Sequence, residues 1–164
     1  MSKVFVLDTS VLIYDVDCLS KFGDNVVIIP SVVFEEINLL KEENTERGFY
    51  ARQISIQLDE LSQQAPLRKG VKLGETTIKT SYEVENSEIK QSLIMDKNDY
   101  KIIACALNNN AILISRDRMM RVIARDFVEA QQYEADMINT EIYKGIRKSL
   151  FVNTKSRSSS RINY

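Results

Sequence analysis

Three short runs of hydrophobic residues stand out along the chain. They cover Val4–Leu7, Val26–Ile29 and Ala111–Ile114, and none of them alternates with polar residues. An apolar run of this length without alternation is typical of a strand buried on both faces, as in a parallel sheet. We therefore expect central strands at these three positions.

Helical spacing of hydrophobic residues follows each run. Helices are predicted at residues 31–40, 48–65, 99–107 and 118–125. Ser31 would cap the first and Asn98 the third, because both side chains can accept a hydrogen bond from a free N–H group of the first turn. Pro66 would end the second. Strands that alternate with helices through short connections indicate an α/β domain with right-handed crossovers.

The segment 67–95 has a different pattern. Val71–Leu73 and Thr77–Tyr82 alternate polar and apolar residues, which predicts an edge hairpin or an exposed strand. Gln131–Tyr133 is a candidate for one last edge strand. These weaker patterns lie outside the three central strands.

Composition limits the chemistry. With 164 residues, 44% apolar and 27% charged, the chain suits one globular domain. It contains no histidine, which excludes Ser-His-Asp hydrolysis, Cys-His chemistry and histidine-ligated zinc. Cys18 and Cys105 lie among apolar residues and form no ligand cluster, so we expect reduced core thiols and a cytoplasmic location. No apolar run approaches the length of about 20 residues that a membrane span needs.

Charge is distributed unevenly. Residues 1–143 carry 16 Lys and Arg against 23 Asp and Glu, whereas residues 144–164 carry six basic and no acidic residues. We predict a domain at 1–143 and a basic, Ser-rich tail at 144–164, which would be a flexible linker or a remnant of cloning. Contact of the tail with nucleic acid is the alternative. The acidic body needs an explanation of its own.

Four acidic residues are candidates for that explanation. Asp8 and Asp117 directly follow predicted strands, while Glu36 and Asp99 lie near the starts of predicted helices. In an open parallel sheet, ligands bind outside the carboxyl ends of the strands. Each residue alone could be a helix cap or a solvated side chain. If all four converge, a cation must offset their repulsion, and oxygen ligands without His or Cys select Mg²⁺ or Mn²⁺.

Four sequence blocks occur in a defined order. They are Asp8-Thr-Ser10, Pro30-Ser-Val-Val-Phe-Glu-Glu-Ile37, Asn98-Asp-Tyr-Lys-Ile-Ile-Ala-Cys-Ala106 and Leu113-Ile-Ser-Arg-Asp117. Their order and approximate spacing, over roughly residues 3–135, resemble the PIN domain family. The segments Arg47–Arg52, Asp117–Arg121 and Ile142–Gly145 resemble, more narrowly, the PIN domain that precedes PhoH-like ATPases. This resemblance implies a three-layer α/β/α fold with a mostly parallel central sheet of four or five strands.

The same resemblance implies a function. It implies a metal-dependent endoribonuclease that cleaves single-stranded RNA to leave 5′-phosphate and 3′-hydroxyl ends. Asp8, Glu36, Asp99 and Asp117 would hold one or two Mg²⁺ or Mn²⁺ ions. Glu36 is chosen over its neighbour because the family pattern has an acid followed by an aliphatic residue, here Ile37. Ser10 would orient a carboxylate or a metal-bound water, with a helix N-cap as the equal alternative.

The chain departs from the family in two respects. Many members carry an acid or Asn about three residues after the fourth acid, where this chain has Met120. Asp96 could substitute, or a second ion could bind only with substrate. No Gly-x-x-x-x-Gly-Lys-Ser/Thr phosphate loop occurs, so a PhoH-like ATPase partner would be a missing C-terminal half or a separate chain.

Partners follow from the charges and the family. RNA phosphates could be bound by arginines near the acidic residues, namely Arg47, Arg52, Arg116, Arg118 and Arg121, each of which could instead be a solvated surface residue. A homo-oligomer is possible, since PIN relatives are often dimers. Two other functions stay open: a VapC-type toxin RNase neutralised by an antitoxin, and a non-cleaving PIN module for RNA binding or protein docking.

Overall fold

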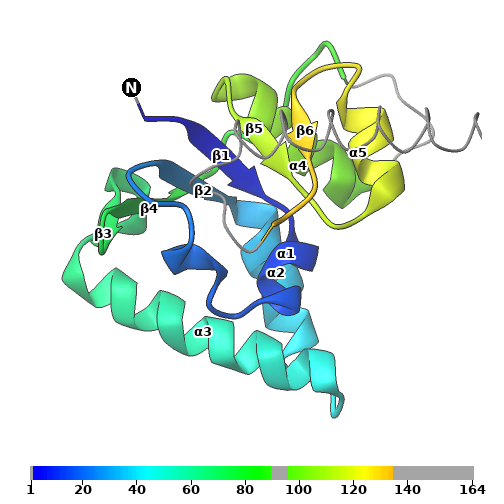
Figure 1. Ribbon diagram of the computed structural model, residues 1–164. Helices are drawn as coiled ribbons and strands as arrows, with labels where there is room; N and C mark the ends of the chain where they lie inside the picture. Colours follow the sequence, from blue (N-terminus) through cyan, green and yellow to red (C-terminus); the bar gives the residue numbers. More distant parts are fainter. Residues whose placement is uncertain (1, 90–95, 135–164) are drawn as a thin grey trace, which may run out of the picture.

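A computed structural model describes residues 2–89 and 96–134 of the chain (Figure 1). The predicted tail at 144–164, the domain limit at 143 and the Ile142–Gly145 block lie outside these residues. None of the helices in the described ranges combines the length and hydrophobicity that a membrane span requires. Both cysteines are free thiols buried in the core, as predicted.

One six-stranded sheet organises the domain (Figure 1). Its strands are β1 (Val4–Leu7), β2 (Val26–Pro30), β3 (Val71–Leu73), β4 (Thr76–Ser81), β5 (Ile112–Ile114) and β6 (Ala130–Gln131), in the order β3-β4-β2-β1-β5-β6. All neighbours pair in parallel except β3 and β4. The mostly parallel sheet is confirmed, but the expected number of four or five strands was too low, because β3 and β6 are very short edge strands.

Within the described residues, five helices connect and cover the strands. They are α1 (Thr9–Tyr14), α2 (Ser31–Leu40), α3 (Glu46–Gln64), α4 (Lys97–Asn108) and α5 (Arg118–Ala124), with short 3₁₀ turns at Cys18–Ser20 and Leu67–Lys69. From β1 the chain moves through β2 to β4 in one direction and then through β5 to β6 in the other. Right-handed crossovers therefore place α1–α3 and α4–α5 on opposite faces of the sheet. The three-layer α/β/α fold is confirmed.

Burial explains why the apolar runs form the sheet centre. Phe5, Val6 and Leu7 of β1 are all fully buried, on both faces of the strand. The alternating segment at β4 forms the expected hairpin with β3, but β4 is not exposed, because it also pairs with β2. Its inward threonine Thr80 donates from Oγ1 to the Ile29 carbonyl (3.0 Å). A polar residue is thus accommodated inside the sheet by a hydrogen bond.

Two predicted helix caps were wrong. α2 begins at Ser31 after Pro30, and no side chain caps it. α4 begins at Lys97, and its cap is Asp96, whose Oδ1 accepts from the Asn98 backbone N–H (2.7 Å). Asn98 therefore lies inside the helix. Asp96, the candidate replacement for a missing metal-site acid, stabilises the start of α4 through this hydrogen bond.

Candidate active site

The four acidic residues singled out from the sequence line one cavity. Asp8 follows β1, Asp117 follows β5, Glu36 lies on α2 and Asp99 lies in the first turn of α4. The cavity has a volume of about 620 Å³ and lies at the carboxyl ends of the parallel strands. Segments far apart in sequence thus bring four carboxyl groups to one place, as the strand order requires.

Asp8 is the buried centre of this group, with 8% of its surface exposed. Its backbone N–H donates to the Ile114 carbonyl (3.0 Å), which continues the pairing of β1 with β5. Its Oδ2 accepts from the hydroxyls of Ser115 (2.7 Å) and Ser10 (3.0 Å). Burial raises the pKa of Asp8, although the two hydroxyls oppose the rise. The carboxyl group is held in one orientation, and its burial disfavours the charged form.

Ser10 and Ser115 join the two strand ends. Ser10 Oγ accepts from the Arg116 backbone N–H (3.1 Å), and Ser115 Oγ accepts from the Asp117 backbone N–H (3.0 Å). Ser10 therefore orients a carboxylate and does not cap α1, whose N-cap position is Asp8. Ser115 was missed from the sequence. Its only signal there is a small hydroxyl residue directly after a buried strand.

Glu36 and Asp99 are partly buried and electrostatically strained. Burial raises the pKa of Glu36 to about 7, with the Asp8 and Asp99 charges adding to the rise. Burial also raises the pKa of Asp99 to about 6, again with a contribution from Asp8. The nearby Thr9 hydroxyl offsets part of the rise at Glu36, but no hydrogen bond of normal geometry joins them. Glu36 Oε1 is buried and has no hydrogen-bond partner among residues 2–89 and 96–134.

Asp117 lines the cavity and also caps helix α5. It is exposed, and its Oδ1 caps α5 by accepting from the backbone N–H groups of Met119 (2.9 Å) and Met120 (3.2 Å). Its Oδ2 makes no hydrogen bond within the described residues and is available to a ligand. Asp96 does not line the cavity, yet its charge contributes to the raised pKa values of Glu36 and Asp99.

Two of the five predicted arginines line the cavity. Arg47 reaches it from the first turn of α3, and Arg116 reaches it from the turn after β5. The Arg116 guanidinium carbon lies 3.4 Å from the centre of the Tyr14 ring, a cation–π arrangement. Positive charge therefore lies beside the carboxyl groups.

The other three arginines lie away from the cavity. Arg52 donates to the carbonyls of Lys41 (2.8 Å) and Glu43 (3.2 Å), and Arg118 is exposed on α5. Arg121 is buried and donates to the Ser115 carbonyl (2.9 Å). Arg121 therefore supports the turn that carries Ser115, which the sequence did not indicate.

The four carboxyl groups of the cavity have the chemistry that binds a divalent cation, but they do not form a preorganised coordination site. All its ligand atoms would be carboxylate oxygens, which suit Mg²⁺ and Mn²⁺. Within residues 2–89 and 96–134, no three acidic side chains come close enough together to hold an ion as they stand. Mg²⁺ commonly keeps several waters and uses one or two carboxylates with substrate phosphates. A cavity of about 620 Å³ has room for that arrangement.

Stability of the metal-free protein should depend on pH. Glu36 and Asp99 have pKa values of about 7 and about 6, raised above their ordinary 4.5 and 3.8. At a pH between the ordinary and the raised values, the folded state therefore binds more protons than the unfolded state. Stability is then present at low pH and is lost as the pH rises through about 6 to 7. In EDTA, we expect calorimetry to show a loss of about 2 kcal/mol between acidic and mildly alkaline buffer, after allowing for solvent screening.

Two comparisons check this pH dependence. Adding Mn²⁺ at alkaline pH should restore the loss, because the cation favours the charged carboxylates. The Glu36→Gln variant in EDTA should show a shallower slope than the wild type. If Glu36→Gln does not change the dependence of stability on pH, the raised pKa of Glu36 cannot be its cause, and this prediction would be contradicted.

Known proteins resemble this chain in sequence and in fold. The sequence profile described as PIN domain matches residues 5–134. Protein PhoH2 of Bacillus subtilis is 32% identical over 97% of this chain and 39% of its own length. Protein PhoH2 of Thermobispora bispora is 33% identical over 84% of this chain and 33% of its own length. The chain thus spans between a third and two fifths of these relatives.

A solved structure shows the same fold. A domain of a functionally unknown protein from Methanocaldococcus jannaschii superposes with a TM-score of 0.54 at 22% identity. The match covers 81% of this chain and 92% of that one, and at this identity it supports the fold alone. Together with the profile match, which covers most of the sequence, this shows that the chain belongs to the PIN domain family.

Proposed function

We propose that this chain is a metal-dependent endoribonuclease that hydrolyses phosphodiester bonds of single-stranded RNA. The observation that carries the proposal is one cavity lined by Asp8, Glu36, Asp99 and Asp117, with the pKa raised at the first three. Such a group of carboxyls costs free energy unless a cation offsets it. PIN domains are generally nucleases, and the family assignment supports the same conclusion.

The four carboxyl groups would hold Mg²⁺ or Mn²⁺. The Oε1 of Glu36 is buried with no hydrogen-bond partner among the described residues, so it is the atom most in need of a ligand. The exposed Oδ2 of Asp117 does not take part in the helix cap and is open to the same ion. When bound, a divalent ion lowers the pKa of water and stabilises charge on the attacking and leaving oxygens. Asp8 would contribute a carboxylate of fixed orientation, because Ser10 and Ser115 hold its Oδ2. The absence of histidine is consistent with water activated in this way.

Substrate binding would rest on the two arginines of the cavity. Arg47 and Arg116 stand beside the carboxyl groups, and a polyanion needs such positive charge to approach an acidic pocket. Attack by water at phosphorus does not use the ribose 2′-hydroxyl. We therefore expect products with 5′-phosphate and 3′-hydroxyl ends.

The chain would work with a larger partner. The relatives named PhoH2 are about two and a half to three times longer than the part that matches this chain. We propose that a PhoH-like ATPase domain follows in the same protein or acts as a separate chain. In that arrangement the ATPase would deliver RNA to the nuclease domain.

The test is an end-group analysis of RNA products. The purified chain is incubated with single-stranded RNA labelled at its 5′ end, in Mn²⁺, in Mg²⁺ and in EDTA. We expect internal cleavage in the metals only, and ligation or phosphatase treatment should identify the predicted ends. RNA binding without cleavage, by a protein whose circular dichroism shows it folded, would favour the non-cleaving module instead.

A further inference from the structure

A second cavity adjoins the acidic one. It has a volume of about 670 Å³ and shares the side chains of Tyr14 and Arg116 with the acidic cavity. Its other walls include Asp15, Lys21 and Gln132. Because two residues line both spaces, a ligand chain leaving the acidic cavity at this side passes Tyr14 and Arg116 and enters the second cavity.

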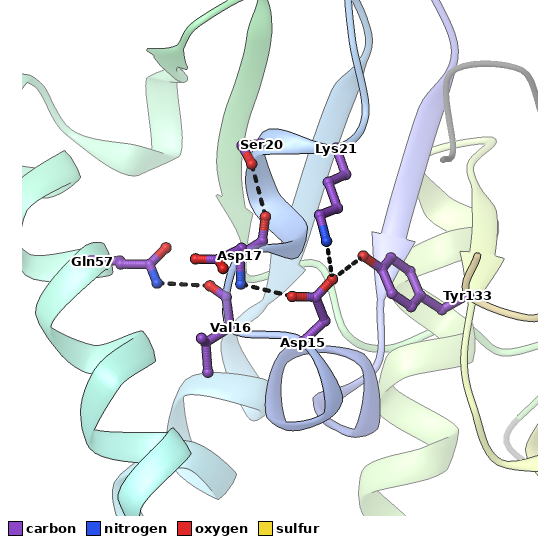
Figure 2. Close-up of polar contacts among 7 residues, drawn as sticks. All are labelled: Asp15, Val16, Asp17, Ser20, Lys21, Gln57 and Tyr133. Atoms are coloured by element: carbon purple, nitrogen blue, oxygen red, sulfur yellow. Dashed lines mark hydrogen bonds and ion pairs between the residues drawn. The ribbon is translucent and has the colours of Figure 1, made fainter. Parts of the chain in front are cut away.

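One wall of the second cavity is held by a hydrogen-bond network (Figure 2). Asp15 Oδ2 accepts from Lys21 Nζ (2.7 Å) and from the Tyr133 hydroxyl (2.6 Å). Burial alone would raise the pKa of Asp15, but the bonds from Lys21 and Tyr133 outweigh it and lower the value. The Lys21 charge is therefore neutralised. This network fixes the wall and leaves Lys21 poorly placed to bind a phosphate.

The charges of the cavity cancel. Asp15 and Glu134 balance Lys21 and Arg116 among its lining residues. A space without net charge that has aromatic walls suits an uncharged base better than a phosphate. Gln132 adds an exposed side-chain amide to the lining of this cavity. An amide of this kind can donate to and accept from the edge of a base.

Arg116 forms a platform between the two cavities. Its guanidinium lies 3.4 Å above the ring of Tyr14, which is 60% exposed. The side chain makes no ion pair or hydrogen bond within residues 2–89 and 96–134. A planar guanidinium stacks well on a base and can bind phosphate at its edge. Tyr14 supports the plane from below.

From these features we propose that the second cavity is a nucleotide subsite. It holds the base and ribose next to the phosphate that lies in the acidic cavity. The base stacks on the Arg116–Tyr14 platform, and the Gln132 amide contacts its edge. This inference rests on the proposed function and gives a structural reason for its single-stranded substrate. A base must leave its stack to enter the cavity, so the strand bound here must be single-stranded.

Binding without cleavage tests the subsite. Fluorescence anisotropy is measured with a short fluorescein-labelled oligouridylate in EDTA and again in Ca²⁺. We expect Tyr14→Leu and Arg116→Met each to weaken binding about tenfold, the scale of one lost base stack. Matched controls are Tyr82→Leu, whose tyrosine is 69% exposed outside both cavities, and Arg68→Met, also exposed outside them. These controls should stay within twofold of the wild type.

A second readout reports stacking directly. The fluorescence of an oligonucleotide carrying 2-aminopurine should change when the wild type binds it, because the base leaves its stack with neighbouring bases, and Arg116→Met should lose most of that change. Gln132→Ala, an exposed substitution, provides a further variant if Tyr14→Leu alters the circular dichroism. A duplex of the same sequence should bind at least about tenfold more weakly than the single strand.

The possible outcomes separate the two proposals. Absence of RNA binding by the wild type in both buffers would contradict the proposed function and this inference with it. Wild-type binding that the Tyr14→Leu variant leaves within twofold would overturn the subsite alone. An unchanged Arg116→Met would also contradict the phosphate-binding role that the proposed function gives to Arg116. Equal binding of duplex and single strand would also overturn it and would contradict the single-strand preference of the proposed nuclease, while leaving its metal dependence untouched.

Discussion

Replacing Glu36 by Gln is expected to reduce metal-dependent RNA cleavage by roughly a hundredfold or more. Even residues that only hydrogen-bond to a metal ligand lower metal affinity or activity by about ten- to a hundredfold when they are mutated. Glu36 lines the acidic cavity, and its Oε1 is buried with no hydrogen-bond partner in the part of the chain that the structure describes. Gln preserves the shape of the side chain but removes the negative charge that a divalent cation needs. The measurement is the initial cleavage rate of labelled single-stranded RNA in Mn²⁺.

The neighbouring residue supplies the matched control. Glu35 has the same side chain, is exposed and does not line the cavity. Glu35→Gln should therefore keep its rate within twofold of the wild type. In EDTA at alkaline pH, Glu36→Gln should in addition unfold at a higher temperature than the wild type, because the strained charge is gone. Equal rates for the two Gln variants would contradict the choice of Glu36.

Replacing Gly48 by Ala is expected to destabilise the domain by about 3 kcal/mol, which corresponds to a thermal midpoint lower by roughly 10 °C. A Cβ at this position would lie 2.0 Å from the Glu43 carbonyl oxygen and 3.0 Å from the Leu40 carbonyl oxygen. Both contacts are with backbone, so the start of α3 must move away from the end of α2. Thermal unfolding followed by circular dichroism measures the effect.

Gly48 also connects stability to the site. Arg47 precedes it in the first turn of α3 and lines the acidic cavity, so a displaced helix start should weaken RNA binding as well. Gly74→Ala is the comparison, because nothing lies within 4 Å of its Cβ and only its positive φ of 61° is unfavourable. That variant should lose about 1 kcal/mol. A Gly48→Ala midpoint no lower than that of Gly74→Ala would contradict the close helix contact.

The sequence was sufficient for the central strands and for the place where the acidic residues meet. Unbroken apolar runs can be buried only inside the sheet, and Asp8 and Asp117 follow two such runs. The edge strands were harder, since β6 has only two residues and is defined by its pairing with β5. The cap of α4 was misassigned because Asp96 and Asn98 are both good cap residues. Which of them is the cap depends on where the helix begins, and α4 begins at Lys97, directly after Asp96.

Ser115 shows what sequence reading could not supply. Its role depends on the register of β1 against β5, which pairs Leu7 with Ile114 and so brings the next residues, Asp8 and Ser115, side by side. A serine after a strand otherwise indicates only a turn. Arg121 has the same difficulty, because charged residues on a short helix are usually solvated, and here the side chain is buried against the Ser115 carbonyl.

The Mn²⁺ dependence of RNA cleavage, measured for the wild type beside Asp8→Asn, tests the central claim most directly. Asn retains an oxygen that can accept from Ser10 and Ser115, so the fold around β1 and β5 should persist. We expect the wild-type rate to rise with Mn²⁺ and to vanish in EDTA, and Asp8→Asn to show no metal-dependent cleavage. Cleavage by the wild type in EDTA, or cleavage that survives Asp8→Asn, would contradict a metal-dependent nuclease centred on this cavity.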